Sequence, residues 1–96
     1  MDLNHALKVA LETGKVRIGL TETLDAAEGK AARLLIIAKS CPEPKLTGSP
    51  KFNKIPIYHY DGDAVELGAA CGKPFPISAL AILEPGSSAI LSLETG

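Results

Sequence analysis

Leu34-Leu35-Ile36-Ile37-Ala38 is the stretch that decides the fold of this 96-residue chain. The run is apolar throughout and lacks the polar alternation of a half-exposed strand, so it predicts a strand that is covered on both faces. On either side of it, helical and strand patterns alternate along the chain. Such alternation predicts an α/β fold with a largely parallel or mixed sheet that lies between helices.

The residues before this run predict two helices and one strand. A first helix begins after Asp2 and ends before Gly14, because apolar residues recur there at helical spacing. This spacing is carried by Leu3, Ala6, Leu7, Ala10 and Leu11. Val16–Ile18 alternates as a short strand, and Thr21 is a suitable N-cap for a second helix that ends at Gly29.

The residues after the run predict a less regular second half. Pro42–Pro56 contains four prolines, so a helix there must be short or broken. Ile57–Tyr60 and Ser78–Leu83 are strands, Ala64–Ala70 is a helix, and Ser87 begins a short helix through Leu93. The predicted order is α-β-α-β-α-β-α-β-α, with four strands, and the length fits one domain over residues 1–96.

Composition narrows the classes of protein that this chain can represent. No apolar run approaches the roughly 20 residues of a membrane helix, and the N-terminus lacks the pattern of a secretory signal, so we expect a cytosolic protein. Cys41 and Cys71 have no metal-ligand spacing and are expected to be free thiols that pack as small hydrophobic side chains. No metal or cofactor is expected.

The net charge of −1 conceals a basic middle third. Residues 29–60 hold six basic side chains and one acidic side chain, Glu43, while the flanking segments are acidic. The basic side chains are Lys30, Arg33, Lys39, Lys45, Lys51 and Lys54. On charge alone, a solvated face and a local phosphate-contacting patch are equally good interpretations.

Catalytic motifs are missing from the sequence. There is no Gly-rich phosphate loop, no nucleophile elbow and no zinc-protease motif, and each His is isolated. The densest carboxylate group is Asp61, Asp63 and Glu66, which turn and helix-cap chemistry explains better than acid–base catalysis. We therefore expect no catalytic residues and no enzyme activity.

Two loops favour binding instead. Gly19–Thr23 opens the second helix, where free backbone N–H groups suit a phosphate, and the Glu22 carboxylate could accept hydrogen bonds from a guanine edge. The alternative is an ordinary helix start, in which Glu22 favours the helix dipole. In Cys71–Ile77, Phe75 stands between two prolines, so it could stack on an unpaired base while Lys73 reaches a phosphate. The alternative is that the Phe75 ring plugs the end of the sheet.

These loops belong to an ordered set of motifs that spans nearly the whole chain. The set comprises Gly19–Leu24, Gly29–Ala31, Ser40–Pro42, Ile55–Tyr58, Glu66–Gly68, Ala70–Phe75 and Glu84–Gly86. With it, the sequence resembles the archaeal and eukaryotic large-subunit ribosomal protein L-thirty (e-type) family, within the kink-turn-binding ribosomal protein superfamily. The Leu-Gly-x-x-Cys-Gly-Lys-x-Phe stretch is the most specific part of the resemblance.

The resemblance implies a three-layer α/β/α sandwich with a four-stranded mixed sheet that binds a kink-turn or internal loop of ribosomal RNA. Gly19, Thr21 and Glu22 would meet sheared G·A pairs. Lys39 and Ser40 would approach the RNA backbone or a base. The apolar and stacking side of the RNA-binding site would consist of Lys73, Pro74, Phe75 and Ile77.

The resemblance also implies partners and a location. These are ribosomal RNA and neighbouring ribosomal proteins, with no membrane, in a protein of the cytoplasmic ribosome that is a monomer when free. The sequence departs from the family at Thr21, where a Lys is usual, and at Asp25, where a Lys or Arg is usual. Both changes remove positive charge from the expected RNA surface. Alternatives are a diverged paralogue that acts as a protein-interaction module and a component of a guide-RNA particle.

Overall fold

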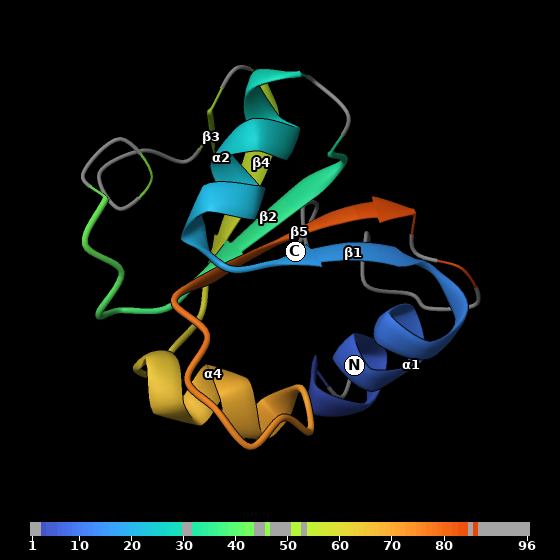
Figure 1. The fold of residues 1–96 in the computed structure, drawn as a ribbon, viewed down its shortest axis with the longest axis vertical. Helices are drawn as coiled ribbons and strands as arrows, with labels where there is room; N and C mark the ends of the chain where they lie inside the picture. The colour runs from blue at the N-terminus through green and yellow to red at the C-terminus, as the bar shows by residue number, and fades with distance from the viewer. Residues whose placement is uncertain are drawn as a thin grey trace.

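The structure is a computed structural model that describes residues 3–29, 32–43, 46, 51–52, 54–84 and 86. Helices and strands alternate along most of the chain (Figure 1). The helices are α1 (Leu3–Thr13), α2 (Leu20–Glu28) and α4 (Ala64–Ala70). The strands are β1 (Lys15–Ile18), β2 (Leu34–Ile37), β3 (Lys51–Phe52), β4 (Ile55–His59) and β5 (Ala79–Glu84).

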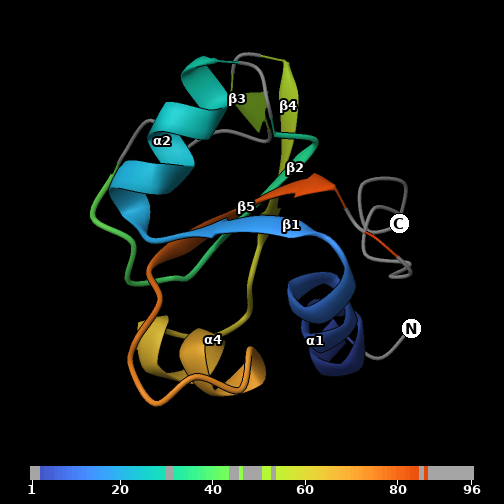
Figure 2. The same ribbon diagram turned by 45° about the vertical axis from the view of Figure 1, so that its right-hand side comes forward.

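The strands form one mixed sheet in the order β1-β5-β2-β4-β3. Strand β2 pairs parallel with β4 and antiparallel with β5, and β1 pairs antiparallel with β5. Helix α2 covers one face of the sheet, while α1 and α4 cover the other (Figures 1 and 2). The described residues thus form the expected α/β sandwich of three layers.

Strand β2 explains why the core has two halves. All four of its residues are buried, and successive side chains point to opposite faces of the sheet. Leu34 and Ile36 join the apolar cluster under α1 and α4, whereas Leu35 and Ile37 join the cluster under α2. The prediction that this run is a strand covered on both faces is confirmed.

The prediction of a four-stranded sheet was wrong, because the structure has a fifth strand in the proline-rich stretch. Lys51 and Phe52 pair antiparallel with Pro56 and Ile55, and Lys54 has a positive φ of 70° between the two strands. This hairpin places Pro56 inside β4, next to a two-residue strand at the edge of the sheet. Hydrogen bonding to β4 within this tight hairpin made a strand of Lys51–Phe52, although the prolines around it favoured irregular structure.

The start of the second helix also differs from the expectation. Thr21 is not the N-cap, because α2 begins at Leu20 and Gly19 occupies the cap position without a side-chain cap hydrogen bond. By contrast, the capping box of α4 is present, with Asp63 and Glu66 satisfying each other's backbone N–H groups. The bounds of the first helix were predicted correctly.

Two expected helices fall largely or wholly on residues outside those described. Of the proline-rich stretch where a broken helix was expected, Leu46 is described as helical and fully buried. The predicted helix from Ser87 to Leu93 lies outside the described residues. Among the helices that are described, none is long and apolar enough to cross a membrane.

Candidate nucleic-acid interface

Four loops that the sequence separates widely meet at one end of the sheet. Strands β1, β2 and β4 run in the same direction and end there, and β5 begins there. Backbone hydrogen bonds tie these ends together, from Gly19 N–H to the Ala79 carbonyl (2.9 Å) and from Ala38 N–H to the Ser78 carbonyl (2.9 Å). We call this region the loop end of the sheet, and define it as Gly19–Glu22, Ala38–Ser40, Tyr60–Asp63 and Lys73–Ser78.

Gly19 makes the turn from β1 into α2. Its φ of 108° lies in the region that side chains disfavour, although a Cβ there would meet nothing within 4 Å. The buried hydroxyl of Thr23 donates a hydrogen bond of 2.7 Å to the Gly19 carbonyl and fixes the first turn of the helix. The first turn of α2 is therefore held in place, and its N-terminus opens at the loop end of the sheet.

Thr21 and Glu22 are both exposed in that first turn. The Glu22 carboxylate already has a partner, because its Oε2 lies 3.5 Å from Nη1 of Arg17 on the neighbouring strand. Both side chains are more than half exposed, so this ion pair adds little stability. It places a guanidinium beside the carboxylate, an arrangement that sequence reasoning missed because Arg17 looked like an ordinary strand residue.

Lys39 is held at the loop end by a carboxylate that the sequence suggested only as part of a turn. Its Nζ lies 2.8 Å from Oδ1 of Asp61, and its backbone N–H donates to the Gly62 carbonyl at 2.8 Å. The hydrogen bond and the charge of Asp61 raise the pKa of Lys39, and the same contact lowers the pKa of the Asp61 carboxyl. Both side chains stay fully charged at neutral pH.

Ser40 has a structural bond that the resemblance did not suggest. Its Oγ accepts a hydrogen bond of 2.9 Å from the backbone N–H of Ala64, the first residue of α4. The residue is nevertheless exposed. Ser40 therefore helps Asp63 to satisfy the free N–H groups at the start of this helix.

The loop from Lys73 to Ile77 lies along α4. Its ends are fixed by hydrogen bonds of 2.9 Å from Lys73 N–H to the Gly68 carbonyl and from Ile77 N–H to the Ala64 carbonyl. Between these anchors, Lys73 and Pro74 are exposed, and the Phe75 side chain is 48% exposed. The alternative in which Phe75 plugs the end of the sheet is therefore wrong.

The prediction that Ile77 lines the binding surface is also wrong. Ile77 is only 1% exposed and belongs to the apolar cluster under α1 and α4. The rigid loop turns its side chain inward because Ile77 N–H is bonded to α4 and β5 begins two residues later. Ile77 can support the loop from below but cannot touch a ligand in this conformation.

Gly68 permits the close approach of this loop to α4. A Cβ at Gly68 would overlap the carbonyl oxygen of Phe75. A glycine inside a helix costs about 0.5–1 kcal/mol relative to alanine, so its presence needs such a reason. Gly68 is thus required for the packing of the loop that presents Phe75 against α4.

Apart from Phe75, the described residues contain one other large apolar side chain that is exposed. Val65, on α4, is 66% exposed and is also near the loop end, because α4 begins there. The sequence did not predict that Val65 is exposed, because an apolar residue in a helical pattern is usually expected to be buried.

The basic middle third of the sequence does not form a single patch. Arg33 precedes β2 and Lys54 precedes β4, so both lie at the opposite end of the sheet from Lys39. Lys30 and Lys45 fall outside the described residues. The basic side chains that lie together in the sequence are therefore divided between the two ends of the sheet, because of the direction of the strands.

The described residues give no sign of metal or thiol chemistry at this surface. They contain no group of three or more His, Cys, Asp or Glu side chains that could hold a metal ion. Cys41 and Cys71 are buried free thiols, as predicted. Burial raises the pKa of the Cys71 thiol to about 11, which keeps it protonated and unreactive at neutral pH.

Comparison with known proteins adds to this geometry. The sequence model of the ribosomal protein L7Ae/L30e/S12e/Gadd45 family matches residues 1–92. A relative from Methanospirillum hungatei is 45% identical over 94 residues, which cover 98% of this chain and 99% of the relative. One from Methanosarcina mazei is 41% identical over 92 residues, covering 96% and 88%. One from Methanococcus maripaludis is 40% identical over 97 residues, covering 98% and 92%. All three relatives are named large ribosomal subunit protein eL30.

Proposed function

Because the chain belongs to the ribosomal protein L7Ae/L30e/S12e/Gadd45 family, we propose that it is a constituent of the large ribosomal subunit that binds a kink-turn of ribosomal RNA. It acts on the cytoplasmic ribosome, as a monomer before assembly, and contacts neighbouring ribosomal proteins there. It has no enzymatic role. Its RNA-binding surface consists of Gly19, Thr21, Glu22, Lys39, Ser40, Lys73, Pro74 and Phe75.

The single observation that carries the proposal is the meeting of the Gly19 and Phe75 segments at the loop end of the sheet. Gly19 N–H donates to the carbonyl of Ala79, which lies four residues after Phe75. A helix N-terminus that suits a phosphate and an exposed aromatic ring that suits a base therefore lie at the same end. A bent RNA presents both a phosphate backbone and unpaired bases, so one surface of this kind can hold it.

The chemistry of the individual side chains fits this ligand. The Glu22 carboxylate can accept from the N1–H and N2–H₂ groups of guanine in a sheared G·A pair, and Arg17 beside it offsets its repulsion from nearby phosphates. Lys39 and Lys73 are exposed cations on two loops of this surface, and phosphate contacts from such side chains fix an RNA in register. The half-exposed ring of Phe75 needs little rearrangement to stack on a flipped-out base.

The test is a titration of the full chain against a kink-turn RNA and against a straight duplex of the same length. We expect tight binding of the kink-turn at low salt and much weaker binding of the duplex. Phe75→Ala should cost about 1–3 kcal/mol of binding free energy through lost stacking, while Phe75→Tyr keeps the ring and should bind like the wild type. Equal affinity for the two RNAs, or no binding at low salt, would rule out the proposal.

A further inference from the structure

Strand β1 is an edge strand whose outer side has no partner among the described strands. The ladder with β5 fixes which of its backbone groups face outward. Gly19 N–H donates to the Ala79 carbonyl, and Arg17, two residues earlier, is in register with Ala81 and faces β5 in the same way. The N–H and C=O groups of Val16 and Ile18 therefore point away from β5, and no described strand pairs with them.

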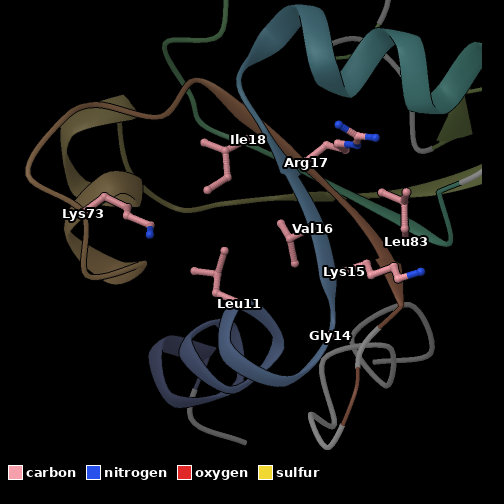
Figure 3. Close-up of a pocket in the computed structure, with 8 residues that line it drawn as sticks. All are labelled: Leu11, Gly14, Lys15, Val16, Arg17, Ile18, Lys73 and Leu83. Atoms are coloured by element: carbon pink, nitrogen blue, oxygen red, sulfur yellow. The ribbon is translucent and has the colours of Figure 1, made fainter.

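A groove of about 430 Å³ follows this free edge (Figure 3). Leu11 from α1 and the side chains of Val16 and Ile18 form its apolar side, and Lys73 points toward them from across the hollow. Lys15 and Arg17 line the groove from the other face of the strand, because side chains alternate along it. The groove is therefore mainly apolar on one face of β1, with Lys73 opposite, and mainly basic on the other, where Leu83 lies beside Lys15 and Arg17.

The charges of the groove select the kind of segment that can enter. No carboxylate lines it. Among the described residues Lys15 and Lys73 have no ion-pair partner, whereas Arg17 is paired with Glu22 outside the groove. A second copy of β1 would bring two more basic side chains, Lys15 and Arg17, against the first pair, so self-pairing is electrostatically unfavourable. A strand with acidic side chains would instead be attracted by the basic side chains of the groove.

We propose that the outer edge of β1 binds an extended segment of a partner protein, in which acidic side chains alternate with apolar ones. The segment adds a strand to the sheet through the backbone groups of Val16 and Ile18. Its apolar side chains pack beside Leu11, Val16 and Ile18. Its acidic side chains meet Lys15, and they compete with Glu22 for Arg17. The proposal does not depend on RNA binding at the loop end, although Lys73 and Arg17 border both surfaces.

The test uses the isotope-labelled full chain and a blocked peptide of alternating Glu and Val residues. At a peptide concentration of about ten times its Kd, amide hydrogen exchange at Val16 and Ile18 should slow about tenfold, because each exchange event requires dissociation. A peptide with Lys in place of Glu should give no protection. Protection that is absent, or equal for the two peptides, would overturn the proposal.

A matched pair of variants locates the site. Lys15→Glu should abolish binding of the acidic peptide, whereas Lys51→Glu makes the same charge change at an exposed lysine of β3, the opposite edge strand, and should leave it unchanged. Equal effects of the two variants would show only a response to net charge and would overturn the proposal. A kink-turn RNA that displaces the peptide and itself protects Val16 and Ile18 would assign the groove to RNA and would likewise overturn it.

Discussion

Lys39 lies at the proposed RNA surface and already forms an ion pair with Asp61, whose Oδ1 is 2.8 Å from the lysine Nζ. Asp61 also adds a negative charge where RNA phosphates would approach. Asp61→Asn should therefore tighten kink-turn binding and make log K steeper against log salt by up to about one unit, as expected for one additional phosphate contact. Isothermal titration over a salt series measures both quantities, and weaker binding by the variant would show instead that Asp61 positions Lys39 for the RNA.

The pH dependence of RNA affinity provides a control for the Asp61→Asn variant. The lowered pKa of Asp61 gives a stabilising contribution that is present above its ordinary value of 3.8 and is lost as pH falls through the lower, folded-state pKa. The raised pKa of Lys39 gives a contribution that is present below 10.5 and is lost as pH rises through the higher, folded-state pKa. The effect of Asp61→Asn on RNA affinity should thus be constant from about pH 5 to pH 9.

Cys71 should make the protein sensitive to alkaline pH. Burial raises its thiol pKa from 9.0 to about 11, so between these values the unfolded chain loses a proton that the folded chain keeps. Stability should therefore fall as pH rises through this window, and Cys71→Ala should fall less steeply. Chemical denaturation at pH 8, 9, 10 and 11 measures the difference, and parallel curves for the two proteins would contradict it.

At the scale of an element, α4 depends on a residue that is 24 positions away in sequence. Ser40 Oγ accepts from Ala64 N–H, and Asp63 accepts from Glu66 N–H, so two side chains cap one helix start. Ser40→Ala should lower the free energy of unfolding by about 1 kcal/mol, because it leaves a helix N–H without its partner. Ser40→Thr keeps the hydroxyl and should retain most of the stability in urea denaturation.

Comparing Ser40→Ala with Ser40→Thr shows whether a loss of RNA affinity is due to loss of the hydroxyl. If the variant weakens binding while Ser40→Thr does not, the hydroxyl matters, either directly or through α4. If Ser40→Ala is as stable as the wild type, the Ala64 hydrogen bond is not a cap that the helix needs.

The contact between α4 and the Phe75 loop provides a second prediction at this scale. Gly68→Ala inserts a methyl group where the Phe75 carbonyl lies, so the loop must move away from the helix. We expect a loss of about 1–3 kcal/mol of stability, as for other overpacked sites, together with weaker RNA binding. Thermal unfolding and RNA titration measure the two effects.

Ala69→Ser is the matched control for this variant, because it adds one atom at the exposed neighbouring position of the same helix. It should change neither stability nor affinity appreciably. A Gly68→Ala protein that is as stable as the wild type would show that the loop can shift at little cost.

At the scale of the whole molecule, the arrangement of charge determines how salt affects binding. The net charge is −1, and Lys39, Lys73 and Arg17 are the cations that the described residues bring to or beside the loop end. Each phosphate contact contributes about −0.9 to the slope of log K against log salt, so we expect a slope of about −2 to −3. Filter binding at several salt concentrations measures this slope.

The control for the salt slope uses the opposite end of the sheet. Arg33→Gln and Lys54→Gln remove cations there and should leave the slope unchanged. A slope that becomes shallower in these variants would extend the RNA surface beyond the loop end.

The sequence by itself determined the elements whose signal is local. The apolar run at Leu34–Ile37 became a buried central strand, and the Asp63–Glu66 spacing became a capping box, because periodicity and capping act over a few residues. The ordered motifs also pointed to the family that the comparisons establish. For Phe75, by contrast, the sequence left an exposed ring and a ring that plugs the sheet as alternatives, and the structure decided for exposure.

Only the tertiary structure decided which distant residues meet. It turned Ile77 into the core, and bound Ser40 to α4 and Asp61 to Lys39. It also separated Arg33 and Lys54 from Lys39, although all three belong to one basic stretch of sequence. The reason is physical: these contacts join residues brought together by strand direction and sheet order, and a local pattern carries no information about a partner on another strand.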